Sequence, residues 1–368
     1  MHRRNGDVNY PFRQKSHMLL LTEVESPDCI LTCMKTDGIC HWKIFSDPLT
    51  PHEKLWGTER MTHEEISMIS GIDAIHACDE LMPYLELQMD RVHSLITPQS
   101  TDNPYLEILS SYSLPFLDMA TFLDPLRMIK TEAEIINMRR AISVTEKAYH
   151  VILHNLHSGM YEYEIEALIA SVFRSNHMTE SYPTIVASGP NACTLHYTKL
   201  ERQLEEGDCV LIDFGAEFHG YAADISRVLC IGKPSSRQIQ VFESIKGVKE
   251  YAESLIRPGM NKGEYEFLVR EKMNEVLVQL SLIPADATKE ERERLSRKYY
   301  PHSTSHFLGL DVHDVGSRET IFEEGMVITC EPGIYIPEEG IGMRLEDDIL
   351  ITSDGCENLS KKIPIQLC

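Results

Sequence analysis

Residues 156–169 read LHSGMYEYEIEALI, and residues 256–269 read IRPGMNKGEYEFLV. The two stretches match at a spacing of 100 residues in five pairs: Gly159/Gly259, Met160/Met260, Glu164/Glu264, Glu166/Glu266 and Leu168/Leu268. Two helix starts with similar capping chemistry would produce these matches. A duplicated structural unit would produce them as well, and the elements around the two stretches distinguish between these explanations.

The expected elements follow the same order twice. Thr131-Glu-Ala-Glu134 has the pattern of a capping box, so a helix is expected to begin there and to end near Ser158-Gly159. A second helix follows, and the remaining expected elements are a β-rich block at 182–231, helices at 236–256 and 263–282, and a β-rich block at about 302–352. The pattern predicts two αα-β halves whose sheets face one another, with a ligand cleft between them.

Residues 1–125 have a different pattern. Short apolar runs and a helix-like stretch around 61–72 predict a smaller N-terminal α/β domain. Leu123-Asp-Pro-Leu126 is expected to be the linker, because proline disfavours a continuing helix before it. The predicted fold class is therefore α+β, with a second domain at 126–368. Trp56 is expected to pack in the N-terminal core, and a subunit contact is the alternative.

Composition limits the partners. Among 368 residues, 35 Lys and Arg oppose 57 Asp and Glu, for a formal net charge of −22. This balance argues against nucleic acid or an anionic membrane as the main partner. No apolar run approaches the roughly 18–20 residues of a membrane span, and Met18–Leu21 is too short for a signal-peptide core. None of the ten cysteines forms a CxxC pair, which favours reduced thiols and a cytoplasmic location.

Several segments place carboxylates or histidines where apolar strand residues are expected. These residues are Asp213, Asp224, His306, His313, Glu331 and Glu346. Each of them alone is explained by a solvent-facing position or an ion pair. Burying them together in one cleft is costly unless something compensates the charge. Two divalent cations would balance four carboxylates, with one neutral histidine completing the set.

Oxygen-rich ligation with a single imidazole favours Mn²⁺, with Zn²⁺, Co²⁺ and Fe²⁺ as alternatives. Two metals roughly 3.5–4 Å apart lower the pKa of a bridging water toward about 7. The expected chemistry is therefore hydrolysis by a metal-bridging hydroxide, with the neighbouring metal polarising a carbonyl group.

The motifs that carry these residues resemble the creatinase/aminopeptidase "pita-bread" metallopeptidases, and most closely their Xaa-Pro aminopeptidase (aminopeptidase P) subgroup. They are TLHY at 194–197, LIDFG at 211–215, GYAADISR at 220–227, SHFLGLDVHDVG at 305–316, EPGIY at 331–335 and GMRLEDD at 342–348. The N-terminal NYPFRQ at 9–14 is similar to that subgroup as well. The resemblance implies a C-terminal pita-bread catalytic domain behind a creatinase-like N-terminal domain. That N-terminal domain is expected to be shortened, because NYPFRQ lies close to residue 1.

The resemblance also implies roles for individual residues. The implied metal ligands are Asp213, Asp224, His306, Glu331 and Glu346, of which Asp224 and Glu346 would bridge the two ions. The implied residues around substrate are His196, His302, His313 and Arg344. Glu331 would also pass a proton to the leaving proline nitrogen. One departure from the family pattern is Ser303, which replaces a glycine between His302 and the metal histidine, so the reach of His302 needs a structural explanation.

The activity implied is release of the N-terminal residue from peptides with proline in second position, by a homo-oligomer (dimer or tetramer). A prolidase that cleaves only Xaa-Pro dipeptides is the main alternative. Creatinase-like enzymes do not keep the metal carboxylates, and binding proteins on this fold typically lose ligands. The complete ligand set in this chain argues against both.

Overall fold

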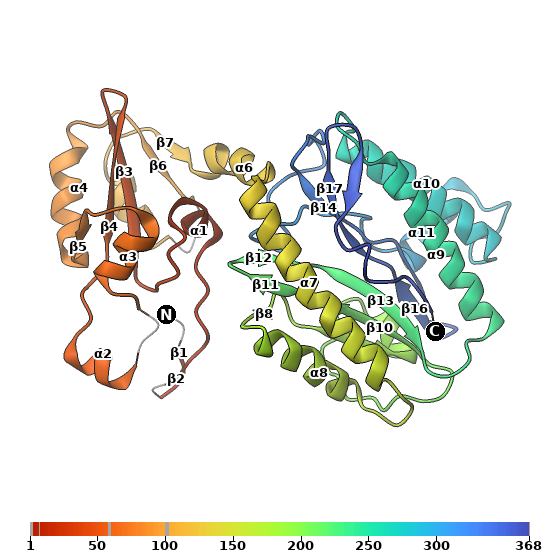
Figure 1. Cartoon of the computed structure of the whole chain (residues 1–368). Helices are drawn as coiled ribbons and strands as arrows, with labels where there is room; N and C mark the ends of the chain where they lie inside the picture. The colour runs from red at the N-terminus through yellow and green to blue at the C-terminus, as the bar shows by residue number, and fades with distance from the viewer. Residues whose placement is uncertain (1–2, 7, 58–59, 100–102, 368) are drawn as a thin grey trace. The chain divides into compact units, whose positions relative to one another are not determined.

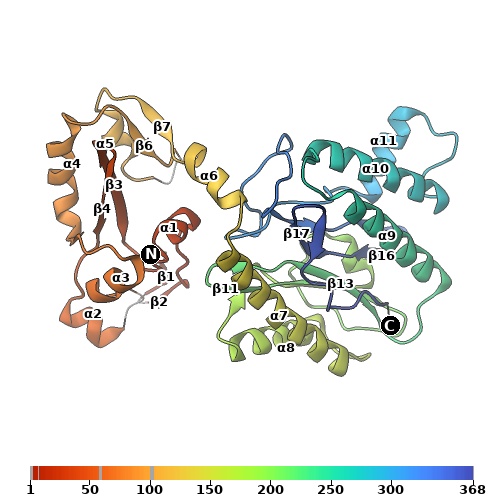
Figure 2. The same cartoon turned by 45° about the horizontal axis from the view of Figure 1, so that its top comes forward.

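The computed structural model describes residues 3–6, 8–57, 60–99 and 103–367. The chain forms two compact units, Met1–Pro125 and Leu126–Cys368. Figures 1 and 2 show both from two sides. The boundary between the units falls inside the 123–126 segment.

That segment is helical, so the prediction of a helix break was wrong. Helix α6 spans Ala120–Met128 with Pro125 inside it. The Asp118 carboxylate accepts a hydrogen bond from the Ala120 backbone N–H at 3.1 Å and so caps the helix start. A proline in this place removes one backbone donor, and the remaining turns of the helix still form around it.

The first unit is a small α/β structure, as predicted. Its main sheet has the order β3-β4-β5 (Ile30–Thr36, Ile39–Phe45, Ile75–His76), with β4 and β5 parallel. Two strand pairs accompany it: β1 (Arg3–Asn5) with β2 (Val8–Asn9), and β6 (Leu95–Thr97) with β7 (Phe116–Asp118). Its helices are α1 (Ser16–Thr22), α2 (Pro51–Trp56), α3 (His63–Ser70), α4 (Leu81–Met89) and α5 (Leu106–Ser110). Val24, Ile44 and Ile66 form its fully buried core.

Trp56 does not belong to that core, so this expectation was wrong. Its side chain is 69% exposed, and neighbouring Leu55 is 82% exposed. The reason is local, because α2 is one short helix that buries none of its residues. Met68 on α3 is 81% exposed as well, so the first unit carries large apolar side chains on its surface.

The second unit begins with two helices and a sheet. Helix α7 (Glu132–Asn155) starts at the predicted capping box, where the Thr131 hydroxyl accepts from the Glu134 backbone N–H. Helix α8 (Glu162–Ser175) follows. The sheet has the order β13-β10-β9 (Ile225–Cys230, Cys209–Phe214, Ile185–Ser188), and a smaller sheet has the order β12-β11-β8 (Tyr221–Ala222, Ala216–Phe218, Thr179–Glu180). The segment 215–220, between β10 and β12, thus contains a strand of its own, β11.

The second half of this unit follows the same order. Helices α9 (Ser236–Leu255) and α10 (Lys262–Gln279) are succeeded by the charged helix α11 (Lys289–Tyr299). The strands are β14 (Val327–Cys330), β15 (Gly333–Ile336), β16 (Ile341–Arg344), β17 (Asp347–Ile351) and β18 (Cys356–Asn358), arranged as sheets β14-β17-β18 and β15-β16. The predicted β-rich block therefore begins at Val327, and residues 302–326 are irregular backbone within the described stretch 103–367.

The duplication predicted from the sequence is present in the hydrogen bonds. In each half the repeated motif pairs with a later segment: Gly159 with Leu204 and Gly259 with Phe322, Glu162 with Arg202 and Lys262 with Thr320, Tyr163 with Leu200 and Gly263 with Arg318. Equivalent donors thus reach equivalent carbonyls, which similar capping alone does not explain. Figure 1 shows the matching helix pairs, α7 with α8 and α9 with α10, beside the strands of the second unit.

Candidate metal centre

Strand β10 directs Asp213 toward the space between the two halves. Val210 and Ile212 belong to the core beneath α7 and α8, whereas Leu211 belongs to the core formed with α9 and α10. Because side chains alternate along a strand, Asp213 points to the same side as Leu211. The carboxylate is therefore buried toward the second half of the unit, with an exposure of only 7%.

Asp224 and Glu346 come from facing segments of the two halves. Asp224 lies between β12 and β13, and Glu346 lies between β16 and β17. The Glu346 backbone N–H donates to the Ser226 carbonyl at 3.1 Å, and the Ser226 hydroxyl donates to the Glu346 carboxylate at 2.7 Å. These two bonds fix Glu346 beside the start of β13, close to Asp224.

His306 enters the same space from the irregular 302–326 segment. Its Nε2 lies 3.3 Å from an Asp224 oxygen and 3.7 Å from a Glu331 oxygen. Its Nδ1 lies 3.0 Å from the Phe307 carbonyl, so Nδ1 carries the proton that binds this carbonyl. Burial alone would lower the pKa of His306, but the hydrogen bond to Asp224 and the charge of Glu331 raise it to about 9, so Nε2 carries a proton in this structure. A metal ion bound at Nε2 would displace that proton.

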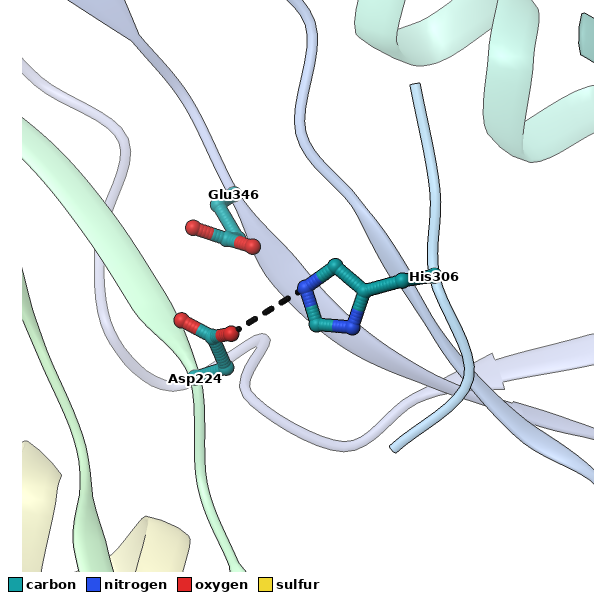
Figure 3. A group of neighbouring side chains, drawn as sticks. All are labelled: Asp224, His306 and Glu346. Atoms are coloured by element: carbon teal, nitrogen blue, oxygen red, sulfur yellow. Dashed lines mark ion pairs between the residues drawn. The ribbon is translucent and has the colours of Figure 1, made fainter. Parts of the chain in front are cut away.

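The candidate ligand atoms of Asp224, His306 and Glu346 all lie within 4.8 Å of one another. Figure 3 shows their side chains pointing toward a common space, with the ion pair between Asp224 and His306 marked. Glu331 adjoins this group through His306. Asp213 adjoins it through Tyr182, whose hydroxyl lies 2.6 Å from both Asp213 and Asp224. The structure thus gathers the five predicted ligands into one cluster.

The electrostatics of the cluster are those of a site for cations. Burial raises the pKa of Glu331 to about 7. Burial, followed by the negative charges of Asp224 and Glu331, raises the pKa of Glu346 well above its usual range. Carboxylates that resist ionisation in this way are stabilised by a nearby positive charge. Four carboxylates and one oriented imidazole therefore fit hard or borderline divalent ions.

Arg344 binds the cluster directly, and His302 is joined to Arg344 through the hydroxyl of Tyr335. Arg344 donates to Asp213 at 2.6 Å and to the Tyr335 hydroxyl at 2.8 Å, and that hydroxyl lies 2.9 Å from His302 Nε2. Burial, with the positive charge of Arg344, lowers the pKa of His302 to about 3. His302 is therefore a neutral imidazole in the site.

The other two predicted histidines are more exposed. The His313 ring stacks on the His306 ring at a centroid distance of 4.1 Å, so His313 lies directly beside the cluster. His196 is exposed on the 194–202 loop. Its charge contributes to the lowered pKa values of His302 and His313, so it faces the same space as they do.

Sequence reasoning missed Tyr182, Ser226 and Tyr335, whose hydroxyls hold Asp213, Glu346 and His302. None of the three belongs to a charge-in-strand pattern, and their partners are distant in sequence. Ser226 does lie in the GYAADISR motif and Tyr335 in the EPGIY motif, and these motifs were the available signals.

Comparison with known proteins gives the family. The sequence profile of metallopeptidase family M24 matches residues 136–353, and that of the aminopeptidase P N-terminal domain matches residues 1–96. The chain belongs to metallopeptidase family M24. The pita-bread fold and the dependence on divalent metal ions expected from the motifs follow from this membership.

M24 relatives match over almost the whole chain. An Xaa-Pro aminopeptidase of Haemophilus influenzae is 34% identical over 99% of this chain and 89% of its own length. The solved proline aminopeptidase P II of Yersinia pestis is 31% identical, with a TM-score of 0.90 over 99% of this chain and 91% of its own. The aminopeptidase P of Escherichia coli, solved with the inhibitor Pro-Leu, is 31% identical with a TM-score of 0.91, over 99% of this chain and 90% of its own.

These M24 matches confirm the prediction of a metallo-aminopeptidase and do not favour the prolidase alternative. They also confirm the α+β class, with a creatinase-like domain preceding the pita-bread domain. Among the described residues, no helix is both long and apolar enough to cross a membrane.

Proposed function

We propose that this chain is an Xaa-Pro aminopeptidase, which releases the N-terminal residue from peptides with proline in second position. The observation that carries the proposal is the cluster of four carboxylates and one oriented histidine between the two halves of an M24 fold, in which Asp213, Asp224 and Glu346 are buried. Relatives described as Xaa-Pro aminopeptidases, matched over 99% of this chain, supply the substrate class.

The cluster would hold two divalent ions, with Mn²⁺ the first candidate and Zn²⁺, Co²⁺ or Fe²⁺ the alternatives. In this assignment the residues that would hold the ions are Asp213, Asp224, His306, Glu331 and Glu346. When bound, such ions supply Lewis acidity that activates water near neutral pH and polarises a carbonyl.

Glu331 is placed to move the proton that the reaction requires. One of its oxygens lies 3.7 Å from His306 Nε2, and the other lies 3.7 Å from His302 Nδ1. The leaving proline nitrogen has no N–H in the peptide and must gain a proton as the bond breaks. A carboxylic acid between two imidazoles can deliver that proton to the nitrogen.

The three outer histidines would bind substrate and the oxyanion. His302 is neutral and is oriented by the Tyr335 hydroxyl, so its ring position is fixed before substrate arrives. His196 and His313 approach the same space from other loops. A donor aimed at a developing oxyanion contributes a few kcal/mol to the rate, about 2.7–4 kcal/mol for one such bond. Arg344 would orient Asp213 and oppose the rise in its pKa that burial causes.

Residues 126–368 would be the catalytic domain and residues 1–125 the domain that mediates assembly. The exposed Leu55, Trp56 and Met68 of the first unit support a homo-oligomer, a dimer or tetramer, in which other copies cover them. A cytoplasmic location is supported by the unpaired thiols of Cys33, Cys40 and Cys330, which are stable in a reducing compartment.

The first test is Asp224→Ala, assayed with Arg-Pro-Pro in the presence of Mn²⁺. We expect loss of at least about 1,000-fold in kcat, because the variant removes a shared ligand and a charge that balances the ions. Asp286→Ala, on an exposed turn, is the matched control and is expected to keep full activity. An Asp224→Ala enzyme as active as wild type would refute the proposal, and turnover restricted to Xaa-Pro dipeptides would favour a prolidase.

A further inference from the structure

The segment that carries His302 and His306 is irregular, yet side chains on one face of helix α10 bind its backbone on both sides of Ser303. Lys262, Glu266 and Arg270 are spaced four residues apart on α10, so they lie in a row along the helix. Two of the three side chains bind the backbone of 300–305 directly. None of them belongs to the metal ligands or outer residues assigned above.

Glu266 binds the segment from the histidine side. Its two carboxylate oxygens accept from the backbone N–H groups of Thr304 at 2.8 Å and Ser305 at 3.1 Å. These residues immediately precede His306. Glu266 is 8% exposed, and Lys262 lies 3.5 Å from one of its oxygens, which balances the buried charge. A charge-assisted pair of this kind holds backbone more firmly than neutral hydrogen bonds do.

Arg270 binds the other end. Its guanidinium donates to the Tyr300 carbonyl at 3.0 Å and to the His302 carbonyl at 2.8 Å. It also lies 4.7 Å from the centroid of the Tyr300 ring, where a cation–π contact adds to the fixation. Four backbone groups, two carbonyls and two N–H groups, are thereby fixed on either side of Ser303.

These contacts of Glu266 and Arg270 with the backbone of 300–305, called the clamp below, explain how the segment tolerates Ser303. The Ser303 residue is exposed between the two anchored pairs, so its side chain meets solvent and the loop geometry does not depend on a glycine there. Strand β14 and the residue after it add a third restraint. The Thr329 backbone N–H donates to the His306 carbonyl, and the Glu331 backbone N–H donates to the Thr304 carbonyl.

The first half of the unit has a counterpart at the same end of its own second helix. The buried Glu162 carboxylate accepts from the backbone N–H groups of Ser188 at 2.7 Å and Arg202 at 3.0 Å, and from the Tyr197 hydroxyl at 2.9 Å. It thereby holds the loop that carries His196. Both halves thus use a buried glutamate near the start of the second helix to fix a loop that bears site histidines.

We propose that Glu266 and Arg270 are positioning residues, which act through the backbone of 300–305 to hold His306 at the metals and His302 at the substrate. The inference rests on the proposed function for its effect on peptide turnover. Its effect on metal binding is independent of which peptide is cleaved.

The test compares Glu266→Gln with Glu275→Gln, an exposed glutamate on the same helix. A glutamine offers one acceptor oxygen and cannot hold both N–H groups. We expect Glu266→Gln to weaken Mn²⁺ binding, measured by calorimetry on the purified chain, by about 10-fold or more. We also expect kcat on Arg-Pro-Pro to fall by about 10–100-fold with KM changed less than kcat, while Glu275→Gln matches wild type.

A folded Glu266→Gln protein with wild-type Mn²⁺ affinity and kcat would overturn the inference. Arg270→Lys provides a second variant if Glu266→Gln does not fold. Lysine keeps the positive charge but lacks the planar guanidinium that donates to both carbonyls. It is expected to lower kcat, and unchanged kcat there would also count against the clamp. If wild type binds Mn²⁺ but cleaves no Xaa-Pro peptide, the proposed function fails. The Mn²⁺ affinities of wild type and Glu266→Gln then still test whether the clamp positions His306.

Discussion

Glu346 and Asp347 are adjacent carboxylates at the start of β17, and they contact different parts of the structure. Glu346 faces the cluster, whereas Asp347 faces away from it and binds Arg227 and Lys249, each at 2.6 Å. Burial alone would raise the pKa of Asp347, but these two cations hold it well below its usual range. Ser360 and Asn358 complete its hydrogen bonds. Asp347 is therefore a structural residue, although it lies within the catalytic motif.

Asp347→Asn should destabilise the fold without changing the metal ligands. The substitution removes the ion-pair partner of Arg227, whose side chain is 1% exposed, and leaves Lys249, 3% exposed, with the Glu253 carboxylate alone. Removing one partner of a buried ion pair costs about 3–5 kcal/mol. Urea unfolding at neutral pH measures this loss, with exposed Asp354→Asn as the control. A change below about 1 kcal/mol would contradict the account.

At the scale of elements, local signals predicted helices better than loops. The capping box at Thr131 gave the start of α7, because both of its hydrogen bonds lie within four residues. The conformation of 302–326 had no such signal, since Glu266, Arg270 and β14 hold it from elsewhere in the chain. For the same reason the sequence predicted which residues belong to the cluster but not the tyrosines that orient them.

An ion pair between α7 and β18 gives a pH prediction. Arg139 donates to both Glu357 oxygens, at 3.1 and 2.7 Å, and these bonds lower the pKa of the Glu357 carboxyl. A carboxyl with a lowered folded-state pKa contributes stability above its unfolded value, about 4.3, and loses it as pH falls through the folded value. Both side chains are over one-third exposed, so solvent screening limits the contribution to about 0.2–1 kcal/mol.

Glu357→Gln should therefore be slightly less stable than wild type at pH 7. The difference should shrink as pH falls below about 4, because the wild-type carboxyl becomes protonated there. Paired urea titrations at pH 7 and pH 3 measure it, and added salt should reduce it at pH 7. A difference that grows on acidification would show that the pair does not act through charge.

At the scale of the molecule, duplication explains why the site lies where it does. Each half supplies a sheet and a loop held by a buried glutamate. Asp213 of β10 meets three carboxylates that lie just outside strands: Asp224 before β13, Glu331 after β14 and Glu346 before β17. Charge placed within apolar strands predicted this convergence, because such residues are stable only where something compensates them. The proposed ions would therefore balance the charge of the two halves as well as supply the catalytic chemistry.

Metal removal should consequently reverse the order of thermal stability of wild type and Asp224→Asn. In EDTA, wild type must bury mutually repelling carboxylates, so Asp224→Asn, which removes one charge, should melt at or above the wild-type temperature. In Mn²⁺ the order should reverse, because binding at 100 times Kd stabilises the wild-type fold by about 2.7 kcal/mol and the variant loses a shared ligand. Differential scanning fluorimetry in both buffers measures this, with Asp286→Ala expected to follow wild type. If wild type melts at the same temperature with and without Mn²⁺, the carboxylate cluster does not bind the ion.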